Sequence, residues 1–443
     1  HSFRSAYWNY KYYRANYLPS LSLTSDPNLN RAINKITMGD GSVKFVEQNL
    51  LNTDLTLNLS QNLSWTGGSF FLETSAQRMD LFSEHKYSWQ TSPIMIGYRQ
   101  SLFGYNSLKW DRRIEPVRYQ EAKKSYVETL ELVSANAINK FFALATAQSD
   151  YDIASFNYAN ADTLYRYAQG RYNIGTITEN EMLQLELNRL TEETNRMNAL
   201  IEMDNCMQEL RSYLGIQEER EIRVRVSSRI PDFSINLNEA LALAYENSPD
   251  IQTMKRRKLE SESAVARARA NAGLKADIYL RFGLTQTADK LPEAYRNLLD
   301  QQYVSLSISL PILDWGRGKG QVRVARSNRD LVYTQVEQNR TDFELNVRKL
   351  VKQFNLQTQR VRIAARTDET AQRRNEVARK LYILGKSTIL DLNASISEKD
   401  SARRNYVSAL YNYWSLYYTL RSMTLYDFES NKLLTEDYNL LIE

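Results

Sequence analysis

Few side chains in this chain could carry chemistry, and they lie far apart. His1 and His85 have no cysteine or cluster of carboxylates beside them, so we expect no metal site. Gly316, Gly318 and Gly320 superficially resemble a phosphate-binding loop, but the Lys-Ser/Thr ending of such a loop is missing. No nucleophile motif or metalloprotease motif occurs either. The sequence therefore predicts no catalytic site, no cofactor and no enzyme activity.

Two carboxylates stand at matching places and could act on ions. Glu181 follows Thr178 by three residues, and Asp391 follows Thr388 at the same spacing. Each pair fits a capping box, in which a hydroxyl and an acid bond the first N–H groups of a helix. If several copies of the chain surrounded one axis, the same acids would also form rings that favour cations. The two roles are compatible, and the spacing leaves both open.

The stretch before the three glycines predicts a strand with one apolar face. Residues 304–310 alternate strictly between apolar residues and serine, as a strand with two different faces does. Such a strand suits a barrel wall between lipid and a wet lumen, and an ordinary sandwich strand would show the same pattern. Pro311 has no N–H to donate and should end the strand, and the glycines then form a hinge into a helix. The residues expected to face lipid are Val304, Leu306, Ile308 and Leu310, and the strand-to-helix junction is Pro311, Gly316 and Gly318.

Weaker alternation predicts further strands in two groups, one before each long helical region. Residues 55–60 alternate leucine with polar residues, and Gly67-Gly68 suits the turn of a hairpin. Aromatic residues between Trp65 and Trp110 suit interface girdles or, alternatively, a buried aromatic core. The first group, 18–105, is predicted to hold strands at 19–24, 51–79 (an extra pair) and 94–104, with loops at 26–49 and 80–87; the second, 274–316, holds strands at 277–285 and 303–310 with a loop at 288–302.

Elsewhere the apolar period is three or four residues, which predicts helices, two of them very long. Leu183, Leu187, Leu190, Met197 and Ile201 keep the heptad spacing of a helix seam. Tyr406, Leu410, Tyr413, Tyr417 and Leu420 form a second such seam. The predicted segments are a helix end at 1–17, a helical hairpin at 106–216, a connector at 217–236, a helix at 237–273, a second hairpin at 317–425 and a C-terminal tail at 426–443.

The two halves of the chain align at one constant offset. Gly175 and Gly385 stand 210 positions apart, and so do the two threonines and the two acids of the capping boxes. Leu-Arg-Ser recurs at 210–212 and 420–422 with the same offset. This offset is far longer than the 20–50 residues of a solenoid repeat. The sequence therefore predicts a duplication within one architecture.

Composition excludes several classes of protein. The net charge of +5 is too small to indicate a nucleic-acid partner. No run of eighteen apolar residues occurs, so we expect any membrane crossing to use strands. Cys206 is the only cysteine and cannot form an internal disulfide. The chain opens inside an apparent helix, and we expect further residues ahead of His1.

Four segments together resemble the TolC-type outer-membrane efflux protein family. ANYLPSLSL at 15–23 is similar to the family's helix-to-strand junction, and SLPILDWGRGKGQV at 309–322 to its strand-to-helix junction. RYNIGTITENEML at 171–183 and LYILGKSTILDL at 381–392 resemble the family's repeated tip. Each motif alone is common. Their order, spacing and duplication together make the resemblance specific, and it covers essentially the whole chain.

The resemblance implies a fold of mixed class. Long antiparallel helical hairpins would form a periplasmic α-barrel joined to a transmembrane β-barrel, with an internal twofold repeat. It implies a homotrimer in which each subunit gives four strands to a shared barrel of twelve. The extra strand pair at 51–79 departs from this pattern. We expect it to form an extracellular or lumen-side hairpin that is not part of the wall; the alternative is that it widens the barrel.

The resemblance also implies a function and partners. The protein would be the passive exit duct of a tripartite efflux or type I secretion system in the outer membrane of a Gram-negative bacterium, with a long periplasmic extension. Its partners would be further copies of itself, a periplasmic adaptor (membrane fusion) protein, an inner-membrane RND or ABC pump, and outer-membrane lipid. A coiled-coil scaffold of the cell envelope is the alternative, because it needs the heptads but not the strands.

The family's periplasmic gate can be carried onto this chain residue by residue. Asp391 matches an acid that lines the constriction, and Tyr382 matches a tyrosine that helps to hold the tip shut. Ser387 stands where the family has a basic residue. We therefore expect the contacts that hold this tip shut to differ from those of the family. The gate residues implied are Asp391, Glu181, Tyr382 and Tyr172, and the tip turns are at Gly175 and Gly385.

Overall fold

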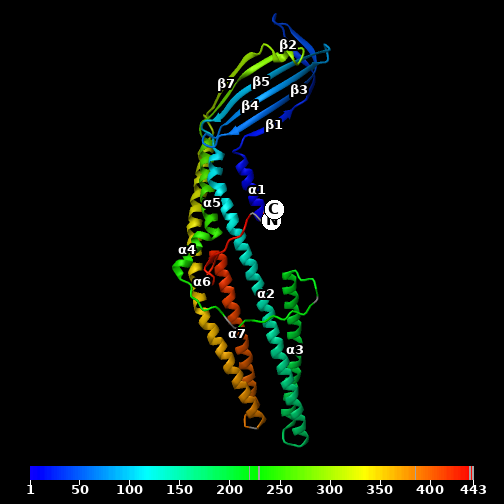
Figure 1. Cartoon of the computed structure of the whole chain (residues 1–443), viewed down its shortest axis with the longest axis vertical. Coiled ribbons are helices and arrows are strands. Elements are labelled where there is room, and N and C mark those ends of the chain that lie inside the picture. The colour runs from blue at the N-terminus through cyan, green and yellow to red at the C-terminus, as the bar shows by residue number, and fades with distance from the viewer. Residues whose placement is uncertain (219, 228–229, 385, 439–440, 442–443) are drawn as a thin grey trace. The chain divides into compact units, whose positions relative to one another are not determined.

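The computed structural model describes residues 1–218, 220–227, 230–384, 386–438 and 441 (Figure 1). Gly385, one of the two predicted tip glycines, lies outside these residues. The helices are α1 Ser2–Ala15, α2 Ser107–Asn173, α3 Glu179–Leu214, α4 Leu237–Asn247, α5 Pro249–Ala272, α6 Arg317–Ile383 and α7 Ile389–Thr424, with a 3₁₀ turn η1 at Glu293–Tyr295. The strands are β1 Ser20–Ser25, β2 Asn28–Thr37, β3 Val43–Asn62, β4 Ser69–Leu81, β5 Lys86–Ser101, β6 Lys275–Ala288, β7 Leu299–Ser309, β8 Tyr426–Asp427 and β9 Lys432–Leu433.

The described residues form two compact units. The first unit comprises residues 1–122 and 252–339, and the second comprises 123–251 and 340–438. The sheet of β1–β7 belongs to the first unit, and α3, α4 and α7 belong to the second. Among the described residues, no helix combines the length and the apolar character that a membrane span requires.

The sheet of the first unit is antiparallel throughout and follows the order β1-β3-β4-β5-β6-β7 (Figure 1). β2 pairs with the N-terminal part of β3, at residues 43–52, and β1 pairs with its C-terminal part, at residues 55–60. Strands β1 and β2 therefore share one position beside β3. The sheet formed by the described residues is six positions wide.

The extra strand pair is part of this sheet, which corrects our expectation of a hairpin outside the wall. β3 pairs with β1 on one side and with β4 on the other, and β4 then pairs with β5. The strand before the pair and the strand after it are thus separated by two further strands. The position of the extra strands in the sheet depends on their pairing with β1 and β5, which lie outside residues 51–79.

Three predicted loops are also corrected. Residues 26–49 are not a loop, because they contain all of β2 and the start of β3. Their polar sequence hides the alternation, but ten register pairs join β2 to β3 along one edge of its main chain. Residues 80–87 and 288–302 are likewise shorter as loops than predicted, since β4, β5, β6 and β7 extend into them.

The junction after β7 ends the strand one residue earlier than predicted. β7 stops at Ser309, so Leu310 follows the strand rather than lying in it. Gly316 adopts a φ of 81°, a left-handed conformation that favours glycine, and α6 begins at the next residue. The Asp314 carboxylate accepts hydrogen bonds from the N–H groups of Gly316 and Gly318, at 2.9 and 2.8 Å. These bonds hold the pKa of the Asp314 carboxyl below its usual range. Gly318 and Gly320 lie inside the helix, so only Gly316 acts as the predicted hinge.

The long helices of the two halves have matching bounds. α2 and α6 contain 67 residues each, and α3 and α7 contain 36 residues each. Every one of the four pairs of bounds differs by 210, the offset seen in the sequence. Helix α2 begins at Ser107, next to the predicted start of the hairpin at residue 106, and Pro116 lies in its interior.

The core of the second unit is aromatic. Phe354 of α6 and Tyr413 of α7 are fully buried, with ring centroids 5.1 Å apart. The Tyr413 hydroxyl donates to the Pro231 carbonyl at 2.9 Å, which ties α7 to the connector. Asn355 of α6 bonds both the N–H and the carbonyl of Ile235, each at 2.9 Å. The connector therefore packs on α6 and α7 through specific contacts that the sequence did not reveal.

Candidate functional site: a two-faced sheet and paired helix turns

One face of the sheet is apolar across all six positions. The register places Leu21, Leu59, Leu72, Ile96 and Phe282 in one row across β1, β3, β4, β5 and β6. All five side chains are exposed, by 37–65%. The neighbouring row reaches β7, where Val304 lies opposite Leu280. This is a continuous apolar surface, and monomeric soluble proteins rarely expose one of this extent.

The predicted alternation in β7 is thus matched by its neighbours. Leu306 lies opposite Ile278, and Ser307 lies opposite Asp277. The four residues expected to face lipid, Val304, Leu306, Ile308 and Leu310, are each about 60% exposed, in the range 58–66%. The first three share a face of β7, while Leu310 lies beyond its end.

The opposite face of the sheet is polar. Glu73 of β4 and Arg281 of β6 form an ion pair there at 3.4 Å, reaching across β5. Phe71 is buried on the same face, packed over Gly97, where a Cβ atom would lie within 2.0 Å of its ring. Most other aromatic side chains of this region are exposed, Trp65 by 77% and Phe70 by 49%. The proposed buried aromatic core between Trp65 and Trp110 is therefore wrong.

The two turns between long helices lie at the same end of the second unit (Figure 1). In the first turn, Gly175 adopts a φ of 73°, and the Thr176 N–H donates to the Arg171 carbonyl at 2.9 Å. In the second turn, the Lys386 N–H donates to the Leu381 carbonyl at 2.8 Å. Both bonds span five residues, as in a Schellman motif, and their positions differ by 210.

Both predicted capping boxes are confirmed. The Asp391 N–H donates to Thr388 Oγ1 at 3.2 Å, and the Thr388 hydroxyl donates to the Asp391 carboxylate at 2.7 Å. The Thr178 N–H donates to Glu181 Oε2 at 2.9 Å in the equivalent box. The hydroxyl of Thr388 holds the pKa of the Asp391 carboxyl below its usual range, and the backbone of Thr178 does the same for Glu181. Both acids are therefore anionic at neutral pH and exposed.

The two tip tyrosines lie in the last turns of α2 and α6. Tyr172 is 39% exposed, and Tyr382 is half-buried. Within the described part of this single chain, neither hydroxyl has a hydrogen bond to another residue. Ser387, which replaces the family's basic residue, is within 3.3 Å of the Asp391 carboxylate and can donate to it.

The two heptad seams differ sharply in burial, although their sequence patterns match. On α7, Leu410, Tyr413, Tyr417 and Leu420 are at most 2% exposed. On α3, the predicted heptad seam is open to solvent. Its residues are exposed by 45–66%, and they are Leu183, Leu187, Leu190, Met197 and Ile201.

The contacts of α7 explain this difference. α7 contacts α6 through Arg403 and Asp368, at 3.2 Å, and contacts α2 through Arg404 and Asp150, at 2.7 Å. α7 therefore has a long helix on each of two sides. α3 contacts α2, for example through Lys140 and Glu209 at 2.7 Å, and among the described residues no second long helix covers its seam.

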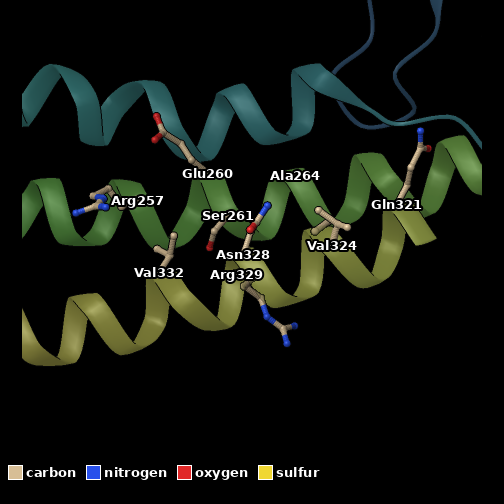
Figure 2. A pocket seen from close by; sticks show the side chains of 10 residues that line it. Arg257, Glu260, Ser261, Ala264, Gln321, Val324, Asn328, Arg329 and Val332 are labelled. Atoms are coloured by element: carbon tan, nitrogen blue, oxygen red, sulfur yellow. The ribbon is translucent and has the colours of Figure 1, made fainter. Parts of the chain in front are cut away.

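A shallow groove lies between α5 and α6 in the first unit (Figure 2). Ser261 and Ala264 of α5 and Val324 and Ala325 of α6 are among the residues that line its cavity of about 490 Å³. The other half of the lining is polar or charged, and it consists of Arg257, Glu260, Gln321, Asn328 and Arg329, with Val332 completing the aliphatic part. No motif in the sequence points to this groove.

Comparisons with known proteins were made for the sequence and for the fold. Residues 240–424 match the family model of the outer membrane efflux protein. A comparison with curated proteins found no match. Among solved structures, the Campylobacter jejuni CmeC outer membrane channel is similar at a TM-score of 0.67 and 15% identity, over 99% of this chain and 84% of that one.

Other outer-membrane proteins share the fold. VceC of Vibrio cholerae is similar at a TM-score of 0.65 and 14% identity, over 96% of this chain and 90% of that one. The open-state MtrE outer membrane channel of Neisseria gonorrhoeae gives a TM-score of 0.61 and 14% identity, over 98% and 87%. At these identities the solved structures establish the fold, and the family model establishes the kinship over residues 240–424. On both findings, residues 240–424 match the outer membrane efflux protein family, and the chain shares its fold with outer-membrane channels.

Proposed function

We propose that this protein is the outer-membrane exit duct of a tripartite efflux or type I secretion system, a passive conduit gated at its helix turns. The observation that carries the proposal is the two-faced sheet. Its apolar face is exposed on every strand position, and its other face carries serines, threonines and the Glu73–Arg281 ion pair. A wall between lipid and a watery lumen requires this arrangement.

The unpaired edges of the sheet support an assembly of several copies. Within the described residues, β7 pairs only with β6, and β1 only with β3. Open strand edges cannot lie in lipid, because their N–H and carbonyl groups would have no partner. A second copy of the chain can supply the missing partner at each edge. We therefore propose a closed barrel built by a homotrimer.

The helices support the same assembly. α7 lies against both α6 and α2, whereas α3 lies against α2 with its apolar seam exposed. Since α2 and α6 hold equivalent places 210 residues apart, α6 of a second copy can cover the α3 seam as α6 covers α7 within one chain. α6 offers exposed aliphatic residues for this contact, Leu356 and Ile363. If each copy makes this contact with the next around one axis, the helices close into an α-barrel. Such a barrel has the internal twofold repeat that the 210-residue offset suggests.

The paired turns are the proposed gate. Trimer formation would bring three copies of Asp391 and three of Glu181 around one axis, and both acids are anionic and exposed in the chain. Such rings favour cations. Tyr382 and Tyr172 would close the tip at rest through hydrogen bonds to neighbouring helices, until an adaptor and a pump dock.

The alternative of a coiled-coil scaffold is not favoured. A scaffold in water gains nothing from an apolar sheet face, and exposing one invites aggregation. The partners that fit the duct are a periplasmic adaptor protein and an inner-membrane pump of the RND or ABC type.

Two measurements test the duct. The protein purified in detergent should have the protein mass of three chains of 51.6 kDa, and planar bilayers containing it should show single-channel currents. A chain that is soluble and monomeric in detergent-free buffer, with no channel currents, would exclude both the trimer and the conduit.

A further inference from the structure

The strand pair β3–β4 is inserted into the middle of the sheet. β3 lies between β1 and β4 along residues 55–60, and β4 lies against β5 on its other side. If the pair were a loop outside the wall, β1 would instead adjoin β5. Among the described residues, β1 and β5 form no register pair.

The inserted pair carries the same two faces as its neighbours. Leu59 of β3 lies opposite Leu21 on one side and Leu72 on the other, and Leu72 lies opposite Ile96 of β5. All four side chains are exposed on one face. A hairpin standing in water outside the bilayer would gain nothing from an apolar row that continues those of the flanking strands. The pair therefore has the pattern of membrane wall.

The number of positions also suits closure by further copies. With six antiparallel positions, the edge strands β1 and β7 run in opposite directions. β7 of one copy can then pair with β1 of the next copy in the antiparallel sense used everywhere else in the sheet. A closed, entirely antiparallel barrel of identical chains requires this even number.

We infer that each chain contributes six strands, so that three copies close a barrel of eighteen strands rather than twelve. This inference rests on the proposed homotrimeric duct. Barrel diameter grows roughly linearly with strand number, so the wall would be about half again as wide as one of twelve strands. The barrel in the membrane would then be about as wide as the lumen of a porin. A bulky hydrophilic solute that has passed the helix turns would fit through such a barrel.

Pairs of introduced cysteines distinguish a barrel of eighteen strands from one of twelve strands. In a Cys206→Ala background, the double variant S22C/N58C joins register partners on β1 and β3 and should form an intrachain disulfide. The matched variant S22C/M95C joins β1 to β5. Asn58, Glu73 and Met95 are successive register partners, so Ser22 and Met95 lie three strand spacings apart, roughly 14 Å, and should not cross-link.

The strand count itself is measured by cryo-electron microscopy of the wild-type protein in lipid nanodiscs. Eighteen strands around one axis, with a cross-link in S22C/N58C only, is the expected result. Twelve strands with a cross-link in S22C/M95C would overturn the inference and leave the duct standing. A monomer without channel currents would overturn the duct as well, and the mass measurement separates that failure from the other.

Discussion

Arg421 of α7 donates to the Glu131 carboxylate of α2 at 3.0 Å, through Nη2 and Oε1, and both side chains are at most 16% exposed. Asp427 approaches the same guanidinium at 3.6 Å. This buried cluster joins the last turn of α7 to the middle of α2 within the second unit.

Replacing this arginine should destabilise the second unit strongly. Arg421→Met leaves two carboxylates without their cation, and breaking a buried ion pair in this way costs about 3–5 kcal/mol. We expect a large fall in the thermal melting temperature. Arg373→Met is the matched control, since its partner Glu369 lies four residues earlier on the same exposed helix face, at 2.7 Å. Equal changes in melting temperature for the two variants would contradict a special role for the buried pair.

The two faces of β7 should respond differently to charge. Leu306→Arg places a guanidinium on the apolar face, which in mid-membrane costs about 2–4 kcal/mol, whereas Ser307→Arg places it on the polar face at much lower cost. Leu306 and Ser307 are adjacent residues of one strand, so the two variants place the charge at nearly the same depth in the barrel wall. The yield of assembled oligomer in membranes, measured by non-denaturing electrophoresis, should fall for Leu306→Arg only. The same yield for both variants would show that the apolar face does not meet lipid.

The Asp391 carboxylate should set ion selectivity at the tip. Asp391→Ala removes the charge and one half of the capping box, so we expect lower cation selectivity in planar bilayers, read from the reversal potential in a salt gradient. Thr388→Ala removes the other half of the box and leaves the charge, at a stability cost of about 0.5–2 kcal/mol. If selectivity stays unchanged in Asp391→Ala while stability falls in both variants, the acid only caps α7.

Tyr382→Phe should raise the conductance of the closed duct. Tyr382 is a half-buried residue at the end of α6, and its hydroxyl has no hydrogen bond inside the described part of the chain, so we expect its partner in the closed tip to come from another copy. Removing the oxygen leaves the ring packing intact. Single-channel recording at fixed voltage measures the effect, and unchanged conductance together with unchanged open time would place the closure elsewhere.

The carboxyl of Glu128 should make stability fall as pH rises. Burial raises its pKa from 4.5 to about 7, and the nearby Asp250 carboxylate adds to this. Between these two values the folded chain binds the proton more tightly than the unfolded chain. The contribution of Glu128 to the free energy of unfolding is therefore present below pH 4.5 and is lost as pH rises through 7.

Glu128→Gln removes this dependence. We expect the variant to melt at a higher temperature than the wild type at pH 8 and to lose that advantage at pH 4.5. Asp250→Asn removes the neighbouring charge and should show a smaller gain of the same sign. A difference in melting temperature between Glu128→Gln and wild type that is the same at both pH values would refute the assignment.

The elements whose cause is local could be predicted from the sequence. The capping boxes at Thr178 and Thr388 need only two residues three positions apart, and both form as expected. The alternation of residues 304–310 likewise determines which residues of that strand share a face. The 210-residue offset in the sequence recurs in the bounds of all four long helices.

Partners distant in sequence could be determined only by the tertiary structure. The predicted seams of α3 and α7 keep the same heptad spacing, yet Tyr413 is buried and Leu187 is 66% exposed, because α7 has long helices on two sides and α3 has one. β2 has a polar sequence and is a strand because β3 pairs with one edge of its main chain. Likewise, nothing within residues 51–79 says which strands lie beside the pair. Main-chain hydrogen bonds are the same for every residue type except proline, so alternation predicts a strand and its faces, and the order of strands follows from the packing of the whole sheet.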